Sequence, residues 1–143
     1  MTTLHFNRVG DWENLPPEPR LRAAVEEALR TRDPGLEGEI SVTFVTEQEI
    51  HALNLQYLGV DGPTDVIAFE VGGPETLLGD IYIAPEVASR RAAEWSVPGP
   101  EELLRLVVHG VLHVLGHDHP SGDDRFDSDM FRLQEAVLRR LDS

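Results

Sequence analysis

Apolar and polar residues recur along this chain with two different periods, which predict an ordered series of strands and helices. Alternation with a period of two predicts strands at 4–9, 40–45, 66–71 and 80–84, with a turn at 72–79. Apolar residues three and four positions apart predict helices at 20–32, 46–57, 85–95, 101–115 and 127–141. We therefore expect the order β-α-β-α-β-β-α-α-α in a single α+β domain spanning 1–143, with a small mixed sheet.

The helix predicted at 101–115 differs from the others because leucine and valine surround it on nearly every side. A helix of this kind lies buried at the centre of a fold. Other residues mark helix ends. Thr46 and Glu49 form a capping box, Pro85 suits a first helical position, and Gly116 suits a left-handed turn after the central helix.

The composition narrows the chemistry that is available. The chain has 143 residues, a formal net charge of −14 and no cysteine, so a bound metal must use imidazole, carboxylate or water ligands. All twelve basic residues are arginine, which reflects either phosphate recognition or a compositional bias. No signal peptide and no apolar run of about 20 residues is visible, and we expect a cytoplasmic protein with no membrane partner.

Four of the six histidines fall within HGVLHVLGHDH at 109–119. His109 and His113 are four residues apart on the predicted central helix, so both imidazoles lie on one face. A turn at Gly116 would let His119 supply a third nitrogen. Three nitrogen ligands and one open position are typical of a catalytic zinc site, whereas the alternative is ordinary helix histidines with hydrogen-bond partners.

The residues between these histidines add two further points. His117 is expected in the turn rather than on the metal, and Asp118 would either orient an imidazole or cap the turn. Gly110 stands where zinc peptidases of the H-E-x-x-H type carry the glutamate that acts as general base. The sequence therefore disfavours a peptidase.

Three segments together resemble a known family. HGVLHVLGHDH resembles the H-G-x-L-H-x-x-G-x-D-H signature of the YbeY endoribonucleases, which are bacterial rRNA maturation factors. The stretch LNLQYLGVDGPTDVIAFE at 53–70 is similar to the second block of that family, and LGDIYIAPEVA at 78–88 is similar to its third. The three blocks occur in the family's order, and with the flanking elements the resemblance covers most of the chain.

The resemblance implies a single-strand-specific, metal-dependent endoribonuclease with one Zn²⁺ ion held by His109, His113 and His119. It also implies a role in small-subunit rRNA 3′-end maturation and ribosome quality control. The expected partners are single-stranded RNA, in particular an rRNA precursor, and the small ribosomal subunit or its proteins. No binding to DNA is expected.

One position departs from the family pattern, because Leu58 replaces the arginine that follows the tyrosine of the second block. Leucine neither binds phosphate nor stabilises its charge. Arg105, one turn before His109, is either a substitute or a surface residue paired with Glu101 or Glu102.

The general base is not identified by the sequence. Asp118, Arg105 and Asp80 are the candidates for catalytic roles, and Asp80 is expected to open a strand beside the cleft. Two other functions stay open, namely a non-catalytic zinc-containing ribosome assembly factor and, less favoured, another zinc hydrolase such as a peptidase.

Overall fold

The order of strands and helices is the one that the sequence predicts. The computed structural model describes residues 2–8, 15–31, 37–70, 76–116 and 129–141, and the statements below concern these residues. The strands are β1 (Thr2–Arg8), β2 (Glu37–Phe44), β3 (Val66–Glu70) and β4 (Thr76–Ile83). The helices are α1 (Glu18–Leu29), α2 (Glu47–Leu58), α3 (Pro85–Glu94), α4 (Gly99–Val114) and α5 (Asp129–Leu141).

The strands form one mixed sheet in the order β1-β2-β4-β3. β1 and β4 both run parallel to β2, and β3 pairs with β4 in the antiparallel direction. The expected small mixed sheet of an α+β domain is therefore confirmed. β4 is an inner strand, and β3 forms one edge of the sheet.

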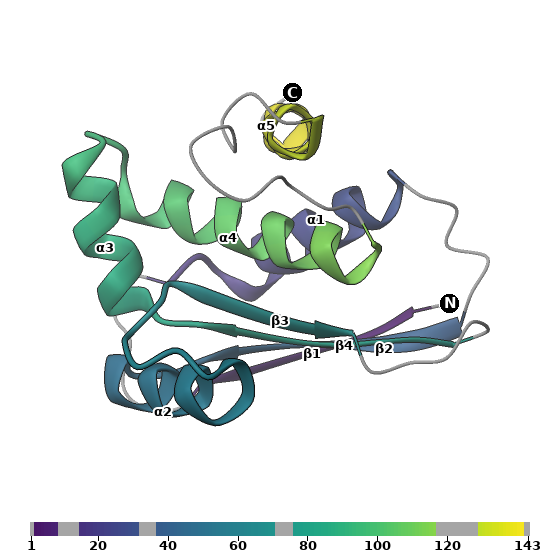
Figure 1. The fold of residues 1–143 in the computed structure, drawn as a ribbon. Coiled ribbons are helices and arrows are strands. Elements are labelled where there is room, and N and C mark those ends of the chain that lie inside the picture. Colours follow the sequence, from purple (N-terminus) through teal and green to yellow (C-terminus); the bar gives the residue numbers. More distant parts are fainter. Residues whose placement is uncertain (1, 9–14, 32–36, 71–75, 117–128, 142–143) are drawn as a thin grey trace.

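Helices cover both faces of the sheet (Figure 1). α1, α4 and α5 lie above one face, with α4 between the sheet and α5, whereas α2 lies below the other face. Successive side chains of a strand alternate between the faces. Ile81 and Ile83 of β4 belong to the large core around α4, while Tyr82 packs with the smaller core around Ile50 of α2.

Two predicted boundaries are wrong because prolines begin helices here. α1 and α4 start at Glu18 and Gly99, two residues before their predicted starts, and Pro19 and Pro100 lie in their first turns. The first helical N–H groups have no acceptor within the helix, so proline removes no hydrogen bond there. Proline at these positions therefore starts a helix rather than breaking one.

The predicted turn at 72–79 is also wrong in part, because β4 already begins at Thr76. Residues 76–79 pair with residues 37–40 of β2, a contact between distant segments that no local pattern reports. Gly79 lies directly beneath α4, since a Cβ atom added there would stand 2.6 Å from Cγ1 of Val114. Glycine at this strand position allows the helix to approach the sheet.

The helix predicted at 20–32 ends earlier, at Leu29. Two predicted signals at helix ends are confirmed. The hydroxyl of Thr46 accepts a hydrogen bond from the backbone N–H of Glu49 at 3.1 Å, as a capping box requires. Gly116 follows α4 with a positive φ of 93°. Within the described ranges, no helix combines the length and apolar character needed to cross a bilayer.

Candidate metal centre

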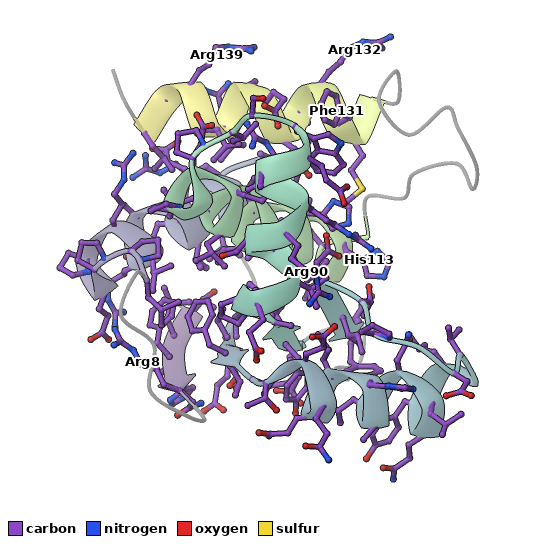
Figure 2. All side chains as sticks on the ribbon, turned by 90° about the vertical axis from the view of Figure 1, so that its left-hand side faces the viewer. Arg8, Arg90, His113, Phe131, Arg132 and Arg139 are labelled. Carbon is purple, nitrogen blue, oxygen red and sulfur yellow. The ribbon has the colours of Figure 1, made fainter. Side chains whose placement is uncertain are left out.

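Helix α4 is buried along most of its surface but carries one polar stripe. Arg105 and His109 are partly buried, and His113, at the C-terminal end of the stripe, is exposed. The four-residue spacing places these three side chains on one side of the helix. The His113 side chain extends from the end of α4 toward the margin of the molecule (Figure 2). His109 and His113 thus lie on one side of this largely buried helix.

A different side of α4 packs against the sheet at Gly110. A Cβ atom at this position would lie 2.7 Å from Cγ2 of Ile81 in β4. Real Cβ atoms do not approach other atoms so closely, so the helix can lie this near to β4 only with glycine. A side chain at position 110 would point into the core against Ile81, where a glutamate base has no space.

The His109 ring is held by a residue from another helix. Its Nδ1 atom lies 2.9 Å from Oε1 of Gln134 in α5. Gln134 is only 5% exposed, so its amide group depends on protein partners rather than on water. Its Nε2 group donates a hydrogen bond of 3.2 Å to Oε2 of Glu135.

Arg105 binds the same carboxylate. Its Nε and Nη2 groups donate hydrogen bonds of 2.9 and 3.0 Å to the two oxygens of Glu135. Glu101 and Glu102, the partners expected if Arg105 is a surface residue, lie 4.0 and 3.7 Å from its guanidinium group. Glu135 lies closer, at 2.9 Å. Arg105 therefore joins α4 to α5.

The carboxylate of Glu135 is ionised through these contacts. Burial raises its pKa, but the hydrogen bonds from Arg105 and Gln134 outweigh burial, and the resulting pKa is lower than that of an ordinary glutamate. An ionised carboxylate accepts hydrogen bonds and donates none.

Glu102 lies in a contrasting environment on the same helix. Glu102 is 2% exposed, and its Oε2 atom has no hydrogen-bond partner within the described part of the chain. Burial raises the pKa of this carboxyl, Arg105 opposes the shift, and the negative charges of Asp65 and Glu135 add to it. Glu102 is thus a buried acid beside the polar stripe.

Three residues of the predicted site, His117, Asp118 and His119, lie outside the described residues. Within the described ranges, no group of three histidine, aspartate or glutamate side chains is close enough to hold a metal ion. The described part of the site therefore consists of two histidines, and the ligand set with His119 stays a prediction.

Two other candidate positions lie away from the histidines. Asp80 is the fifth of eight residues in β4 rather than the first, and it alternates with Ile81, which faces α4. The Asp80 side chain consequently belongs to the opposite face of the sheet. Leu58 is the last residue of α2, is 56% exposed and lies beyond that same opposite face.

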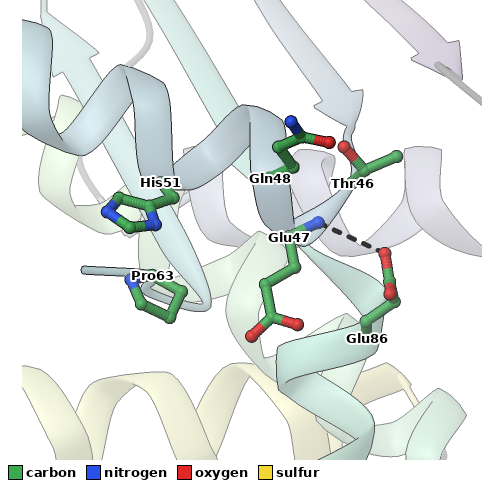
Figure 3. A pocket seen from close by; sticks show the side chains of 6 residues that line it. All are labelled: Thr46, Glu47, Gln48, His51, Pro63 and Glu86. Atoms are coloured by element: carbon green, nitrogen blue, oxygen red, sulfur yellow. Dashed lines mark hydrogen bonds between the residues drawn. The ribbon is translucent and has the colours of Figure 1, made fainter.

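An open pocket between α2 and α3 contains further acidic groups (Figure 3). Glu86 accepts a hydrogen bond from the backbone N–H of Glu47 at 3.2 Å, while Glu47 itself binds Arg90. His51, also in the lining, lies 2.8 Å from Asp61. These groups already have partners within the protein, and no residue of the predicted site lines the pocket.

Five described arginines form ion pairs with carboxylates of other described residues. They are Arg22, Arg30, Arg90, Arg91 and Arg105. In one of these pairs, Arg91 donates to Asp65 at 2.7 Å and so braces the loop that leads into β3. These five arginines are therefore distributed among acidic partners on several elements.

Gln134 and Glu135 were absent from the predicted site, although the sequence contains a signal for one of them. Gln134 comes four residues after Met130 and three before Val137, both buried residues of α5. A polar residue at such a position lies on the buried face of an amphipathic helix and requires a hydrogen-bond partner. The identity of that partner depends on how α5 packs.

Taken together, these features define a small α+β protein with two histidines on one side of a core helix and a glutamine holding one of them. A model of the endoribonuclease YbeY family matches residues 12–142. The chain belongs to this family.

The family relationship is supported by individual relatives. A protein of Pelotomaculum thermopropionicum named endoribonuclease YbeY is 42% identical over 129 residues, which cover 85% of this chain and 84% of the relative. A protein of the same name from Desulfitobacterium hafniense is 36% identical, with coverage of 92% and 94%. A solution structure from Thermotoga maritima is similar with a TM-score of 0.65 and 30% identity, covering 97% of this chain and 89% of that one.

Proposed function

We propose that this protein is a zinc-dependent endoribonuclease that cuts single-stranded RNA, with His109, His113 and His119 as ligands of one Zn²⁺ ion. The observation that carries the proposal is the pairing of His109 and His113 on one side of α4 in a chain of the YbeY endoribonuclease family. Several relatives of this chain bear the name endoribonuclease YbeY.

The described residues fit a divalent metal of intermediate softness. The chain has no cysteine, so imidazole is the softest common ligand that it offers, and imidazole suits zinc. His109 is oriented by a hydrogen bond at Nδ1, the arrangement in which metal-binding histidines are usually held. His113 is exposed, so its ring is accessible from solvent.

The two described histidines would have different roles as zinc ligands. His109, partly buried and held by Gln134, supplies a rigid ligand, and the exposed His113 supplies the ligand nearest to incoming RNA. Zinc, when bound, supplies a Lewis acid that polarises a phosphodiester oxygen. Asp118, which lies between His117 and His119 in the sequence, stays the candidate for the general base. Arg105 would have an indirect role, because its hydrogen bonds go to Glu135 of α5.

A glutamate-dependent peptidase receives no support from the fold. A Cβ atom at the position after the first histidine would stand 2.7 Å from Cγ2 of Ile81, which leaves no room for a glutamate without a shift of the core. An RNA substrate is also what the family's name implies. We further propose that this RNA is the 3′ region of a small-subunit rRNA precursor, encountered in the cytoplasm on the ribosomal subunit, where the enzyme also serves ribosome quality control.

The test is cleavage of an end-labelled single-stranded RNA by zinc-loaded protein, with a duplex of the same sequence beside it. We expect cleavage of the single strand and none of the duplex. The variant His113→Ala should lose the activity, whereas His5→Ala should keep it, because His5 lies on the exposed surface of β1, 3.8 Å from Glu39. Equal cleavage by wild type and His113→Ala, or cleavage by neither, would refute the proposal.

A wild-type protein that binds zinc and pre-ribosomal particles but cuts no RNA would indicate the assembly-factor function instead. Chelation of the metal separates these cases further. Loss of RNA cleavage on chelation, with recovery on adding zinc, supports the nuclease. Loss of particle binding on chelation, in a protein that cuts no RNA, would assign the metal to structure.

A further inference from the structure

A continuous row of polar side chains crosses the contact between α4 and α5 and ends at His109. Arg105 binds Glu135, Glu135 accepts from Gln134, and Gln134 binds His109. The four side chains come from two helices that are separated in sequence by the segment containing His119. Each link is between 2.9 and 3.2 Å long, within the range of ordinary hydrogen bonds.

The direction of every hydrogen bond in the row follows from its chemistry. Guanidinium groups only donate, and ionised carboxylates only accept. Since the carboxylate of Glu135 can only accept from Gln134, the NH₂ end of the Gln134 amide must face Glu135. The carbonyl end, Oε1, must then face His109, where it can only accept. The hydrogen of the neutral His109 ring is consequently on Nδ1.

We propose that Gln134 is a positioning residue that fixes His109 in the tautomer with hydrogen on Nδ1 and the lone pair on Nε2, ready for a divalent cation. Glu135, held by both donors of Arg105, sets the direction in which the Gln134 amide points. The inference rests on the proposed function, because it assigns His109 a role as metal ligand.

Burial gives this arrangement its strength. Gln134 is 5% exposed, and Arg105 and Glu135 have side chains that are 19% and 23% exposed. Water therefore competes weakly for these groups, and an amide rotated the wrong way would place two acceptors, the Gln134 carbonyl and the Glu135 carboxylate, against each other. Ligand histidines held by a second hydrogen bond bind metal about 10- to 100-fold more tightly than those without it.

The direct test is the tautomer of His109 in metal-free protein, read from two-bond proton–nitrogen correlations in histidine-labelled samples. The His109 signals are assigned by their loss in His109→Ala. We expect the Nδ1–H pattern in the wild type. Gln134→Leu and Gln134→Met remove the acceptor and should shift the ring toward the Nε2–H form. An Nε2–H pattern in the wild type, or an unchanged pattern in both apolar variants, would overturn the proposal.

Zinc affinity supplies a second readout, measured by competition with a chromophoric chelator. Gln134→Leu should weaken zinc binding by about 10- to 100-fold relative to the wild type. Gln56→Leu, the same substitution at an exposed position of α2, is the matched control and should bind normally. Equal zinc affinity of Gln134→Leu and the wild type would contradict a positioning role.

The two proposals fail in different ways. A wild type that binds zinc and cuts RNA, yet shows the Nε2–H tautomer, removes the role of Gln134 and leaves the nuclease intact. A wild type that shows the Nδ1–H tautomer but binds no zinc refutes the metal site and, with it, the ligand role of His109.

Discussion

Gly110 of α4 and Ile81 of β4 meet so closely that a Cβ atom on the helix would stand 2.7 Å from Cγ2 of the isoleucine. The contact sets how near α4 lies to the sheet. Since His109 immediately precedes Gly110 in the helix, the same contact also determines which side of α4 carries the histidines.

Gly110→Ala should therefore destabilise the fold even though alanine favours helices. Overpacking a core costs about 1–3 kcal/mol, and the helix propensity of alanine offsets up to about 1 kcal/mol of this. We expect a net loss of about 1–2 kcal/mol in the free energy of unfolding, measured by urea denaturation. Gly99→Ala is the control, because the nearest atom to its new methyl group is 3.9 Å away. A Gly110→Ala protein as stable as Gly99→Ala would contradict the close contact.

Glu102 predicts a pH dependence of stability. Burial raises its pKa in the folded state above the ordinary value of 4.5, so the folded protein binds a proton more tightly than the unfolded chain. The contribution of Glu102 to stability is thus highest below pH 4.5 and is lost as the pH rises through the folded-state pKa. Glu102→Gln should remove this loss.

The measurement is the difference in unfolding free energy between Glu102→Gln and wild type at several pH values from 4.5 to 8. We expect the difference to move in favour of the variant as the pH rises. Measured in the same way at pH values below 4.5, Glu135→Gln should gain stability relative to the wild type as the pH falls, because the pKa of Glu135 is lowered and its contribution is lost on acidification. A flat difference for Glu102→Gln would show that this carboxyl does not titrate abnormally.

Zinc should stabilise the protein if His109 and His113 are ligands. A ligand that binds only the folded state adds about 2.7 kcal/mol at a free concentration 100-fold above its Kd, which corresponds to roughly 8 °C in Tm for a chain of this size. His109→Ala and His113→Ala should lose most of this zinc-dependent shift in a thermal melt. His5→Ala should retain it in full. A shift of equal size in all four proteins would place the zinc elsewhere.

Leu58→Arg tests the departure from the family pattern. Leu58 is 56% exposed at the end of α2, so arginine can be introduced with little effect on the core. If the family arginine contacts RNA phosphate, the variant should cut single-stranded RNA about tenfold faster, as one charge-assisted hydrogen bond would allow. Leu55→Arg is the matched control, because it adds the same charge to the same helix at a residue that is 52% exposed. Equal stimulation by both variants would indicate a general charge effect.

Local patterns determined most of the secondary structure of this protein. The period of apolar residues, the Thr46 capping box and Gly116 follow from interactions within a few residues, and they predicted the element order and several helix ends correctly. The four-residue spacing of His109 and His113 likewise determined that their rings share one side of a helix, since helix geometry alone sets that relationship.

The tertiary structure decided what lies around those histidines. Residues 76–79 form part of β4 because they pair with β2. The side chain of Asp80 lies on the face of the sheet away from α4, because Ile81, the next residue, faces α4. Gln134 reaches His109 only because α5 packs on α4. Contacts of this kind join residues that are 25 or more positions apart, and they depend on the packing of whole elements, which the local sequence does not encode residue by residue.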